Sequence, residues 1–336
     1  MTSEGCLTII QVVLALVGGI ALLLWSATRL IEGAAAAAWH LRVPALLVGM
    51  VVIGFGTSLP EFTVSLLSGL QGTPSLALGN AYGSNIANIG LVLGLSALLR
   101  PVLVHSRVLR VELPILCVVT AASVALMWDG ELSVLDGASL LVVFATLAVW
   151  SVIQGRRGGD DALGVEMQQE LDAHPMTLQR ALIWVAVGLV LLLVSSRALV
   201  WGAVEAATLL GVSDLLIGLT VVAVGTSLPE LAAALAAVRK DEPDLALGNV
   251  LGSNLFNTLG VVGVAVVAGR GMDVPPELLP RDMLAVGVLT VSLYVLGHRF
   301  RKPRGRINRH EGAALLLVYM AYTALLIVTA GGGPAN

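Results

Sequence analysis

Two glutamates lie inside apolar stretches of the sequence, and both close the same six-residue motif, GTSLPE. The motif ends at Glu61 and recurs 169 residues later, ending at Glu230. An acidic side chain at membrane depth costs about 2.5–3.5 kcal/mol on insertion scales and is functional by default. Pro60 and Pro229 precede the acids, and because proline has no N–H, each frees a helix carbonyl beside a carboxylate. The motif predicts a cation site, against the alternatives of a plain proline kink and a protonated structural glutamate.

Hydroxyl and amide side chains accompany each glutamate. Thr and Ser stand before each acid in the motif, and the next apolar stretch carries Asn, Ser and Asn at i, i+4 and i+8, which is one helix stripe. Such oxygen ligands suit hard cations, Ca²⁺ or Na⁺, rather than zinc or copper. The candidate ligands are Glu61, Thr57, Ser58, Ser84 and Asn88, and in the second copy Glu230, Thr226, Ser227, Ser253 and Asn257. Asn80 and Asn249, which begin the two stripes, rank lower because they could instead cap or join helices.

The two motif copies belong to a long internal duplication. PSLALGNAYGSNIAN at 74–88 returns as PDLALGNVLGSNLFN at 243–257, with the same offset of 169 residues. The shared residues are polar ones in an apolar background, so composition alone does not explain them. Each copy also holds glycines at small-xxx-small spacing (GNAYG and GNVLG), which favours close approach of helices.

The composition places the chain in a membrane. Of its 336 residues 57% are hydrophobic and only 12% are charged, and the mean hydropathy is +0.92, whereas soluble domains are about 45–50% apolar and about 25% charged. A net charge of −3 with 4% aromatic residues excludes a basic nucleic-acid binder. Two cysteines and five scattered histidines fit neither a disulfide framework nor a zinc centre.

The hydropathy pattern predicts an all-α polytopic membrane protein. A membrane helix needs about 20 mostly apolar residues. We predict ten spans, near residues 7–27, 43–70, 75–99, 109–127, 132–153, 179–203, 212–238, 244–268, 282–298 and 311–331. The organisation that follows is a first repeat (1–153), a polar linker (154–178) and a second repeat (179–336). Because each half has an odd number of spans, the repeats are inverted, which is typical of transporters with a substrate site near the midplane.

The positive charges predict the orientation. If the ten spans are correct, 16 of the 19 Lys and Arg residues fall on one side of the membrane. Cytoplasmic loops carry this excess. We therefore expect an integral plasma (inner) membrane protein with its linker in the cytoplasm and both termini outside.

At these motifs the sequence resembles the cation/calcium antiporter superfamily, and in particular its prokaryotic sodium/calcium exchangers. The signature repeats of that family match residues 45–94 and 214–263. The resemblance implies that Glu61 and Glu230 bind Ca²⁺ and Na⁺ in competition, with the hydroxyl and amide candidates above as further ligands. It also implies that backbone carbonyls near Gly54 and Ala223 contribute to flanking sodium sites. Asn257 departs from the pattern, because several members have aspartate there.

These observations together predict a secondary antiporter rather than an enzyme, with Ca²⁺ and Na⁺ as transported ligands in a lipid bilayer and no cofactor. The alternative on the same scaffold is a proton-coupled Ca²⁺ or cation antiporter, in which both glutamates are protonated instead of binding Na⁺. Two other classes are an intramembrane hydrolase that uses the glutamates as acid and base, and a passive channel. The absence of a nucleophile–base pair or a metal triad in the sequence disfavours the hydrolase.

Overall fold

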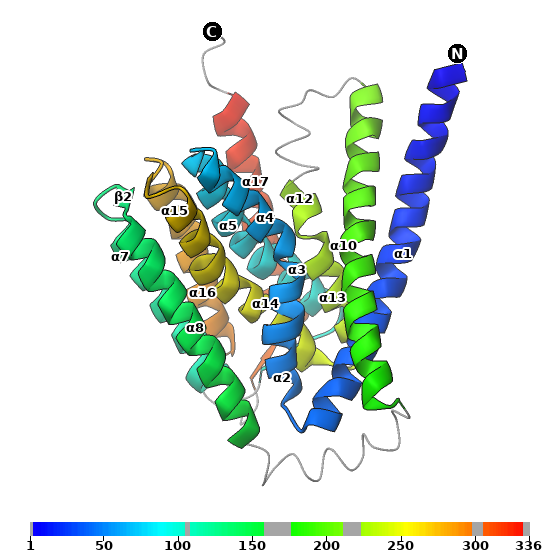
Figure 1. Cartoon of the computed structure of the whole chain (residues 1–336), viewed down its shortest axis with the longest axis horizontal. Helices are drawn as coiled ribbons and strands as arrows, with labels where there is room; N and C mark the ends of the chain where they lie inside the picture. The colour runs from blue at the N-terminus through cyan, green and yellow to red at the C-terminus, as the bar shows by residue number, and fades with distance from the viewer. Residues whose placement is uncertain (1–2, 105–107, 158–175, 211–222, 298–304, 332–336) are drawn as a thin grey trace.

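Helices packed side by side make up most of the described part of the molecule (Figure 1). The computed structural model describes residues 3–104, 108–157, 176–210, 223–297 and 305–331. The helices of the first half are α1 (Ser3–Leu41), α2 (Ala45–Val48), η1 (Gly49–Gly54), α3 (Phe55–Thr57), α4 (Leu59–Leu70), α5 (Pro74–Ala87), η2 (Asn88–Leu93), α6 (Gly94–Leu99), η3 (Val108–Glu112), α7 (Leu113–Leu126) and α8 (Val134–Arg157). Those of the second half are α10 (Leu178–Leu209), α12 (Ala223–Thr226), α13 (Leu228–Arg239), α14 (Pro243–Leu255), η5 (Phe256–Val261), α15 (Val262–Ala268), η6 (Leu278–Met283), α16 (Leu284–Gly297) and α17 (Arg309–Gly331).

The prediction of an all-helical multi-pass membrane protein is confirmed. Seven helices of the described ranges are long and apolar enough to cross a membrane, and the bent pair Ala45–Thr57 and Leu59–Leu70 makes an eighth crossing if it counts as one span. Of the other two predicted spans, 109–127 corresponds to η3 and α7, which is a short α-helix behind a π-helical turn. The span predicted at 212–238 begins outside the described residues and ends in α12 and α13.

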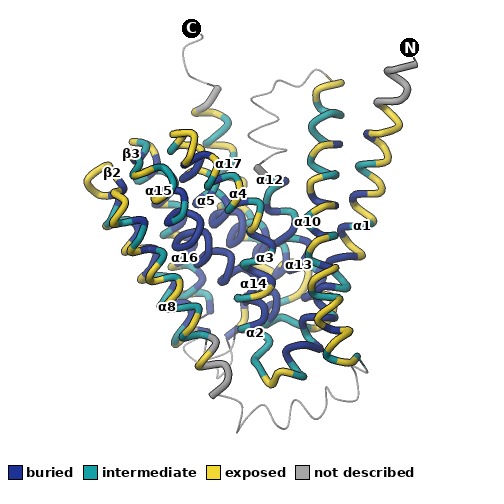
Figure 2. The backbone as a smooth tube through the Cα atoms, viewed as in Figure 1, coloured by how far each residue is buried: buried dark blue, intermediate teal, exposed yellow. Residues whose placement is uncertain are grey.

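Burial separates the helices into an inner and an outer set (Figure 2). The continuous helices Pro74–Leu99 and Pro243–Ala268, which carry the two asparagine stripes, are mostly buried. By contrast α1, α8, α10 and α17 expose apolar side chains, such as Val17 and Leu135. Since no other described part of the chain covers these apolar faces, they are the faces that the lipid solvates.

The helices α1 and α10 pack against each other along much of their length. A Cβ atom at Gly33 would lie 2.8 Å from the Ala181 carbonyl oxygen, and one at Gly188 would lie 2.9 Å from the Leu30 nitrogen. Helix α1 is much longer than the predicted span 7–27: its 39 residues reach about 58 Å, against about 30 Å of hydrocarbon. The helix also includes Arg29, which the prediction had placed in a loop, because alanines at 34–38 continue it towards Leu41.

Two short antiparallel strand pairs, which the sequence analysis did not predict, lie between helices. Strand β1 (Val102–Val104) pairs with β4 (Gly305–Ile307), and β2 (Glu131–Leu132) pairs with β3 (Met272–Asp273). Each pair joins a connection of the first half to one of the second half. The strands are two or three residues long, too short to show an alternating pattern in the sequence.

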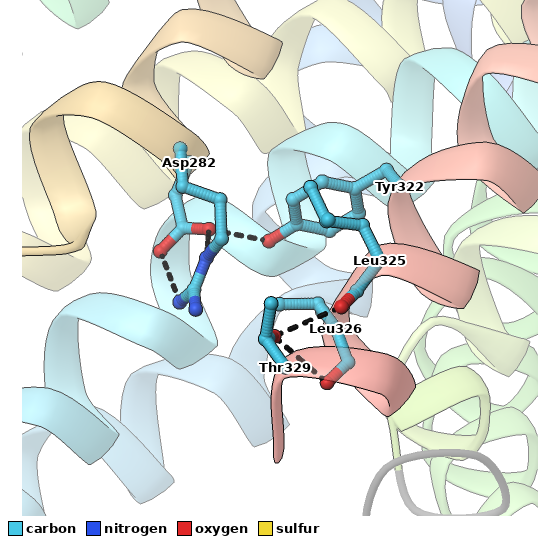
Figure 3. Close-up of polar contacts among 6 residues, drawn as sticks. Asp282, Tyr322, Leu325, Leu326 and Thr329 are labelled. Atoms are coloured by element: carbon cyan, nitrogen blue, oxygen red, sulfur yellow. Dashed lines mark hydrogen bonds and ion pairs between the residues drawn. The ribbon is translucent and has the colours of Figure 1, made fainter. Parts of the chain in front are cut away.

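One buried polar cluster lies away from the centre, where η6 contacts α17 (Figure 3). Asp282 is 4% exposed and accepts two hydrogen bonds from the guanidinium of Arg281, at 2.7 and 3.0 Å. The Tyr322 hydroxyl donates to the same carboxylate at 2.8 Å. Both carboxylate oxygens thus have hydrogen-bond donors, and the bond from Tyr322 connects α17 to η6.

Candidate cation site

Breaks in two spans position the glutamates. Ser58, between α3 and α4, has φ −85° and ψ 13°, and the span bends there by 48°. Ser227, between α12 and α13, has nearly the same conformation, with φ −88° and ψ 5°. The next helix starts at once in both copies, with proline in its first turn, where its missing N–H costs nothing. Each glutamate follows its proline in that first turn.

Both carboxylates lie in the interior, and side chains of the two halves meet around them. Glu61 is 0% and Glu230 is 1% exposed. The Ser58 hydroxyl donates to Glu230 Oε1 at 2.8 Å, a bond between the two halves, and the Ser84 hydroxyl donates to Glu61 Oε1 at 3.3 Å. In the part of the chain that the structure describes, Oε2 of each glutamate has no hydrogen-bond partner. Each carboxylate therefore keeps one buried oxygen available.

Asn80 and Asn249 hold the backbone of the two glutamates. Asn80 Nδ2 donates to the Glu61 carbonyl at 3.0 Å and Asn249 Nδ2 to the Glu230 carbonyl at 3.1 Å. Thr57 Oγ1 in turn donates to Asn249 Oδ1 at 3.2 Å. These contacts favour the helix-joining alternative for the two asparagines over a ligand role.

Two backbone carbonyls near the breaks also have side-chain partners, and one of them, Gly225 O, is the carbonyl that Pro229 frees. Gly54 O accepts a hydrogen bond from the Ser253 hydroxyl at 3.0 Å, and Gly225 O accepts one from the Ser196 hydroxyl at 3.3 Å. A Cβ atom at Gly54 would lie 2.8 Å from the Ser253 nitrogen, so only glycine lets η1 lie this close to α14. The glycines of GNVLG pack in the same interface. No described atom lies within 4 Å of a Cβ placed at Gly79 or Gly83.

The two stripe asparagines lie where the α-helix widens to a π-helix. Asn88 is the first residue of η2, and Asn257 is the second residue of η5. A π-helical turn contains one extra residue and is frequent at functional sites. Asn88 Nδ2 donates to Asn254 Oδ1 at 3.1 Å, whereas Asn257 is 0% exposed and neither of its amide atoms has a partner in the described ranges.

Most of the predicted ligands therefore lie together in the buried centre. The residues that are at most 5% exposed are Thr57, Ser58, Glu61, Ser84, Asn88, Ser227, Glu230, Ser253 and Asn257. Thr226 is half-buried on α12, and Ala223 is the first residue of that helix. Among the described residues no group of three or more His, Cys, Asp or Glu could hold a metal ion. Any cation here would be bound by two carboxylates and neutral oxygens.

Three polar residues in this centre were missed. Asn85 and Asn254, each 1% exposed, are the asparagines of the duplicated GSN. Asn85 Nδ2 donates to Thr258 Oγ1 at 2.8 Å, which crosses from one half to the other. The signal that could have found the asparagines was their recurrence at the 169-residue offset, but they lie off the i, i+4 stripe. Thr258 has no such signal, because isoleucine occupies the equivalent position 89.

An aromatic cluster closes one flank of the centre. Phe256, next to Asn257 in the chain, lies 5.2 Å from Phe55, 5.5 Å from Phe144 and 6.1 Å from Phe62, measured between ring centroids. The four rings come from α3, α4, α8 and η5, so four segments share one apolar contact.

Comparison with known proteins identifies the family. The family model described as "Sodium/calcium exchanger protein" matches residues 11–153 and 180–328. The chain is 42% identical over 309 residues to the putative antiporter CaxA of Alkalimonas amylolytica, covering 92% of this chain and 96% of that protein. It is 38% identical over 314 residues to the inner membrane protein YrbG of Escherichia coli (strain K12), covering 93% of this chain and 95% of YrbG.

A solved structure agrees over nearly the whole chain. The sodium–calcium exchanger NCX_Mj soaked with 2.5 mM Na⁺ and 0.1 mM Ca²⁺ superimposes with a TM-score of 0.80 at 30% identity, covering 94% of this chain and 98% of that one. NCX_Mj soaked without Na⁺ and Ca²⁺ gives 0.81 at 31% identity, covering 94% and 99%. The resemblance inferred from the motifs is confirmed: the chain belongs to the sodium/calcium exchanger protein family, and it is a cation/calcium antiporter and not an enzyme.

Proposed function

We propose that the chain exchanges Ca²⁺ for Na⁺ by alternating access, with Glu61 and Glu230 binding the cations near the membrane midplane. The observation that carries the proposal is the pair of buried glutamates from the two halves, each with one carboxylate oxygen that has no partner among the residues the structure describes. Hydroxyl and amide oxygens surround them, which is the ligand set of hard cations. The further proposed ligands are the side chains of Thr57, Ser58, Ser84, Asn88, Thr226, Ser227, Ser253 and Asn257.

The charge of the site supports coupled exchange. Two ionised carboxylates without a cation are an uncompensated double negative charge in a low-dielectric interior, which costs many kcal/mol. A carrier in that state is strongly disfavoured from moving its site between the two faces. One Ca²⁺ or several Na⁺ neutralise the pair, and either load permits the change of state. Coupling then follows from charge compensation alone.

The relatives support the cation and the location. NCX_Mj has been solved after soaking with Na⁺ and Ca²⁺ and after soaking with Na⁺ and Sr²⁺, and YrbG is an inner membrane protein. We place this chain in the inner membrane as well, with both termini outside and the linker between the repeats in the cytoplasm. In Figure 1, α1 begins and α17 ends at the same end of the molecule, as an even number of spans requires.

Flux in reconstituted vesicles tests the proposal. Vesicles loaded with Na⁺ and placed in Na⁺-free buffer should take up radiolabelled Ca²⁺, driven by the outward Na⁺ gradient. A protonophore should leave this uptake intact. Uptake that needs a pH gradient and proceeds without Na⁺ would instead establish the proton-coupled alternative. Flux that neither saturates nor needs a counter-ion would establish a passive channel.

A further inference from the structure

Asn85 and Asn254 lie in the centre of the molecule but outside the predicted ligand set. They are equivalent residues, a term used here for residues 169 positions apart in the two repeats, and Asn88 and Asn257 are equivalent in the same sense. All four side chains are at most 1% exposed. Their hydrogen bonds differ between the halves although their sequence positions do not.

Asn254 of the second repeat orients Asn88 of the first repeat, which is a predicted ligand. Asn88 Nδ2 donates to Asn254 Oδ1 at 3.1 Å. An amide has a donating end and an accepting end, so this bond fixes which end of Asn88 is left over. The end left over is Oδ1, which is buried and has no partner among the described residues. Since a cation binds oxygen and not N–H, Asn254 holds Asn88 with its useful atom free.

The equivalent bond, from Asn257 of the second repeat to Asn85 of the first, is not made. It would join Asn257 Nδ2 to Asn85 Oδ1, and both atoms are buried without a partner in the described ranges. Leaving a buried donor and a buried acceptor unpaired costs about 1–3 kcal/mol for each group. Asn85 is nevertheless held in place, because its Nδ2 donates to Thr258 Oγ1 at 2.8 Å. A complementary donor and acceptor are thus present on equivalent residues but do not pair.

A second pair of equivalent residues shows the same asymmetry. The Ser58 hydroxyl donates to Glu230 Oε1, whereas the Ser227 hydroxyl, its equivalent, has no partner in the part of the chain described. Inverted repeats exchange conformations when a carrier passes between its two faces. A bond between the halves that is made in one state is therefore expected to be replaced, in the other state, by the bond between the equivalent residues.

We propose that Asn254 and Asn85 are positioning residues that orient the ligand amides of Asn88 and Asn257 and act one at a time. Asn254 orients Asn88 in the state described, and Asn85 orients Asn257 in the state with the repeat conformations exchanged. The inference rests on the proposed function, since it needs alternating access at this site.

Face-specific kinetics of the full chain test the inference. Na⁺-driven Ca²⁺ exchange is measured in right-side-out and in inside-out membrane vesicles, which gives a KM for Ca²⁺ at each face. We expect Asn254→Ala to raise KM about tenfold at one face and Asn85→Ala to raise it about tenfold at the opposite face. Thr258→Val, which removes the nearer of the two acceptors of Asn85 Nδ2 and leaves the Asn254 carbonyl at 3.5 Å, should act at the same face as Asn85→Ala, with a smaller effect.

A structural role alone would not distinguish the faces. Asn308→Ala is the matched control, because Asn308 accepts hydrogen bonds only at the start of α17 and should leave both KM values unchanged. Should the alanine variants not fold, Asn254→Gln and Asn85→Gln keep an amide but displace it by one methylene, and the same pattern is expected. Unchanged KM values, or equal increases at both faces, overturn the inference while wild-type exchange still supports the proposed function. No Na⁺-driven exchange by the wild type overturns the proposed function and the inference that rests on it.

Discussion

Glu61 and Glu230 make different contacts although their motifs are identical. Glu230 accepts a hydrogen bond from the Ser58 hydroxyl of the other half, and Glu61 accepts one from the Ser84 hydroxyl of its own half. Both keep a buried oxygen without a described partner. Because a divalent cation needs both charges, we expect Glu61→Gln and Glu230→Gln to lower Ca²⁺ affinity by at least about 2 kcal/mol, or roughly 30-fold. Isothermal titration of purified protein with Ca²⁺ measures this loss.

The control for the glutamate variants is Glu277→Gln, because Glu277 is exposed and outside the site. It should bind Ca²⁺ as the wild type does, which separates the site charge from net charge. Wild-type affinity in either Glu61→Gln or Glu230→Gln would remove that residue from the cation site.

If Asn257 is a ligand as proposed, its replacement by an acid tests how many negative charges the site holds. Its side chain is fully buried on η5, which packs against the Glu61 helix α4, and both amide atoms are unpartnered in the described ranges. Asn257→Asp would place a third acid there, and neighbouring like charges favour its protonated form until a cation binds. We therefore expect Ca²⁺ binding to Asn257→Asp to release a proton, so that its affinity rises more steeply between pH 6 and pH 8, on the order of tenfold per unit at most. Titration in two buffers of different ionisation enthalpy detects the proton, and an unchanged pH dependence would show that position 257 does not contribute charge to the site.

The elements of the site could be predicted only in part, and the residues show why. Glu61 and Glu230 stood out because a duplicated acid in an apolar stretch is costly, and Pro60 and Pro229 gave the helix breaks beside them. The π-helical turns at Asn88 and Asn257 could not be predicted, because they arise where helices of the two halves pack and not from local preference. Bonds between the halves, such as that of Asn85 to Thr258, were hidden for the same reason.

The contact of η6 with α17 gives a prediction on stability. The Tyr322 hydroxyl donates to Asp282 at 2.8 Å (Figure 3). Hydrogen bonds to charged groups contribute about 1.5–3 kcal/mol, so Tyr322→Phe should lower the Tm in detergent by several degrees. Asp282→Leu should lower it more, because it leaves the Arg281 guanidinium without its carboxylate.

Thr329→Val is the matched control on the same helix. Thr329 donates only to the carbonyls of Leu325 and Leu326, within α17 itself. Its Tm should stay near that of the wild type. A Tyr322→Phe variant as stable as Thr329→Val would show that the Asp282 cluster does not hold the two helices together.

At the scale of the whole molecule, α1 and α10 pack as a pair, and ion pairs connect α1 to the helix that carries Glu230. Glu32 on α1 contacts Arg29 at 2.9 Å and Lys240, at the end of α13, at 2.6 Å. The Arg29 guanidinium also lies 5.3 Å from the centroid of Trp184 on α10. Between α1 and α13 lies a cavity of about 110 Å³, lined by Lys240, Arg239 and mostly apolar side chains that include Leu24 and Leu235. Ion pairs therefore add to the packing of α1 against α13 on the side that we propose to be cytoplasmic.

A contact of this kind should influence which face of the carrier is open. An ion pair with side chains 21% and 43% exposed contributes about 0.2–1 kcal/mol. We therefore expect Lys240→Gln to change the ratio of the two facing states by roughly 1.5- to 5-fold towards the state open on the Lys240 side. The intrinsic Ca²⁺ affinity of each facing state should stay unchanged. Labelling of single cysteines introduced along α13 measures that ratio. Arg239→Gln, one residue earlier and also exposed, should not change it, and the swap Glu32→Lys with Lys240→Glu should restore the wild-type ratio. If the swap failed to restore the ratio while each single variant shifted it, the effect would come from the local packing of Lys240 and not from its charge.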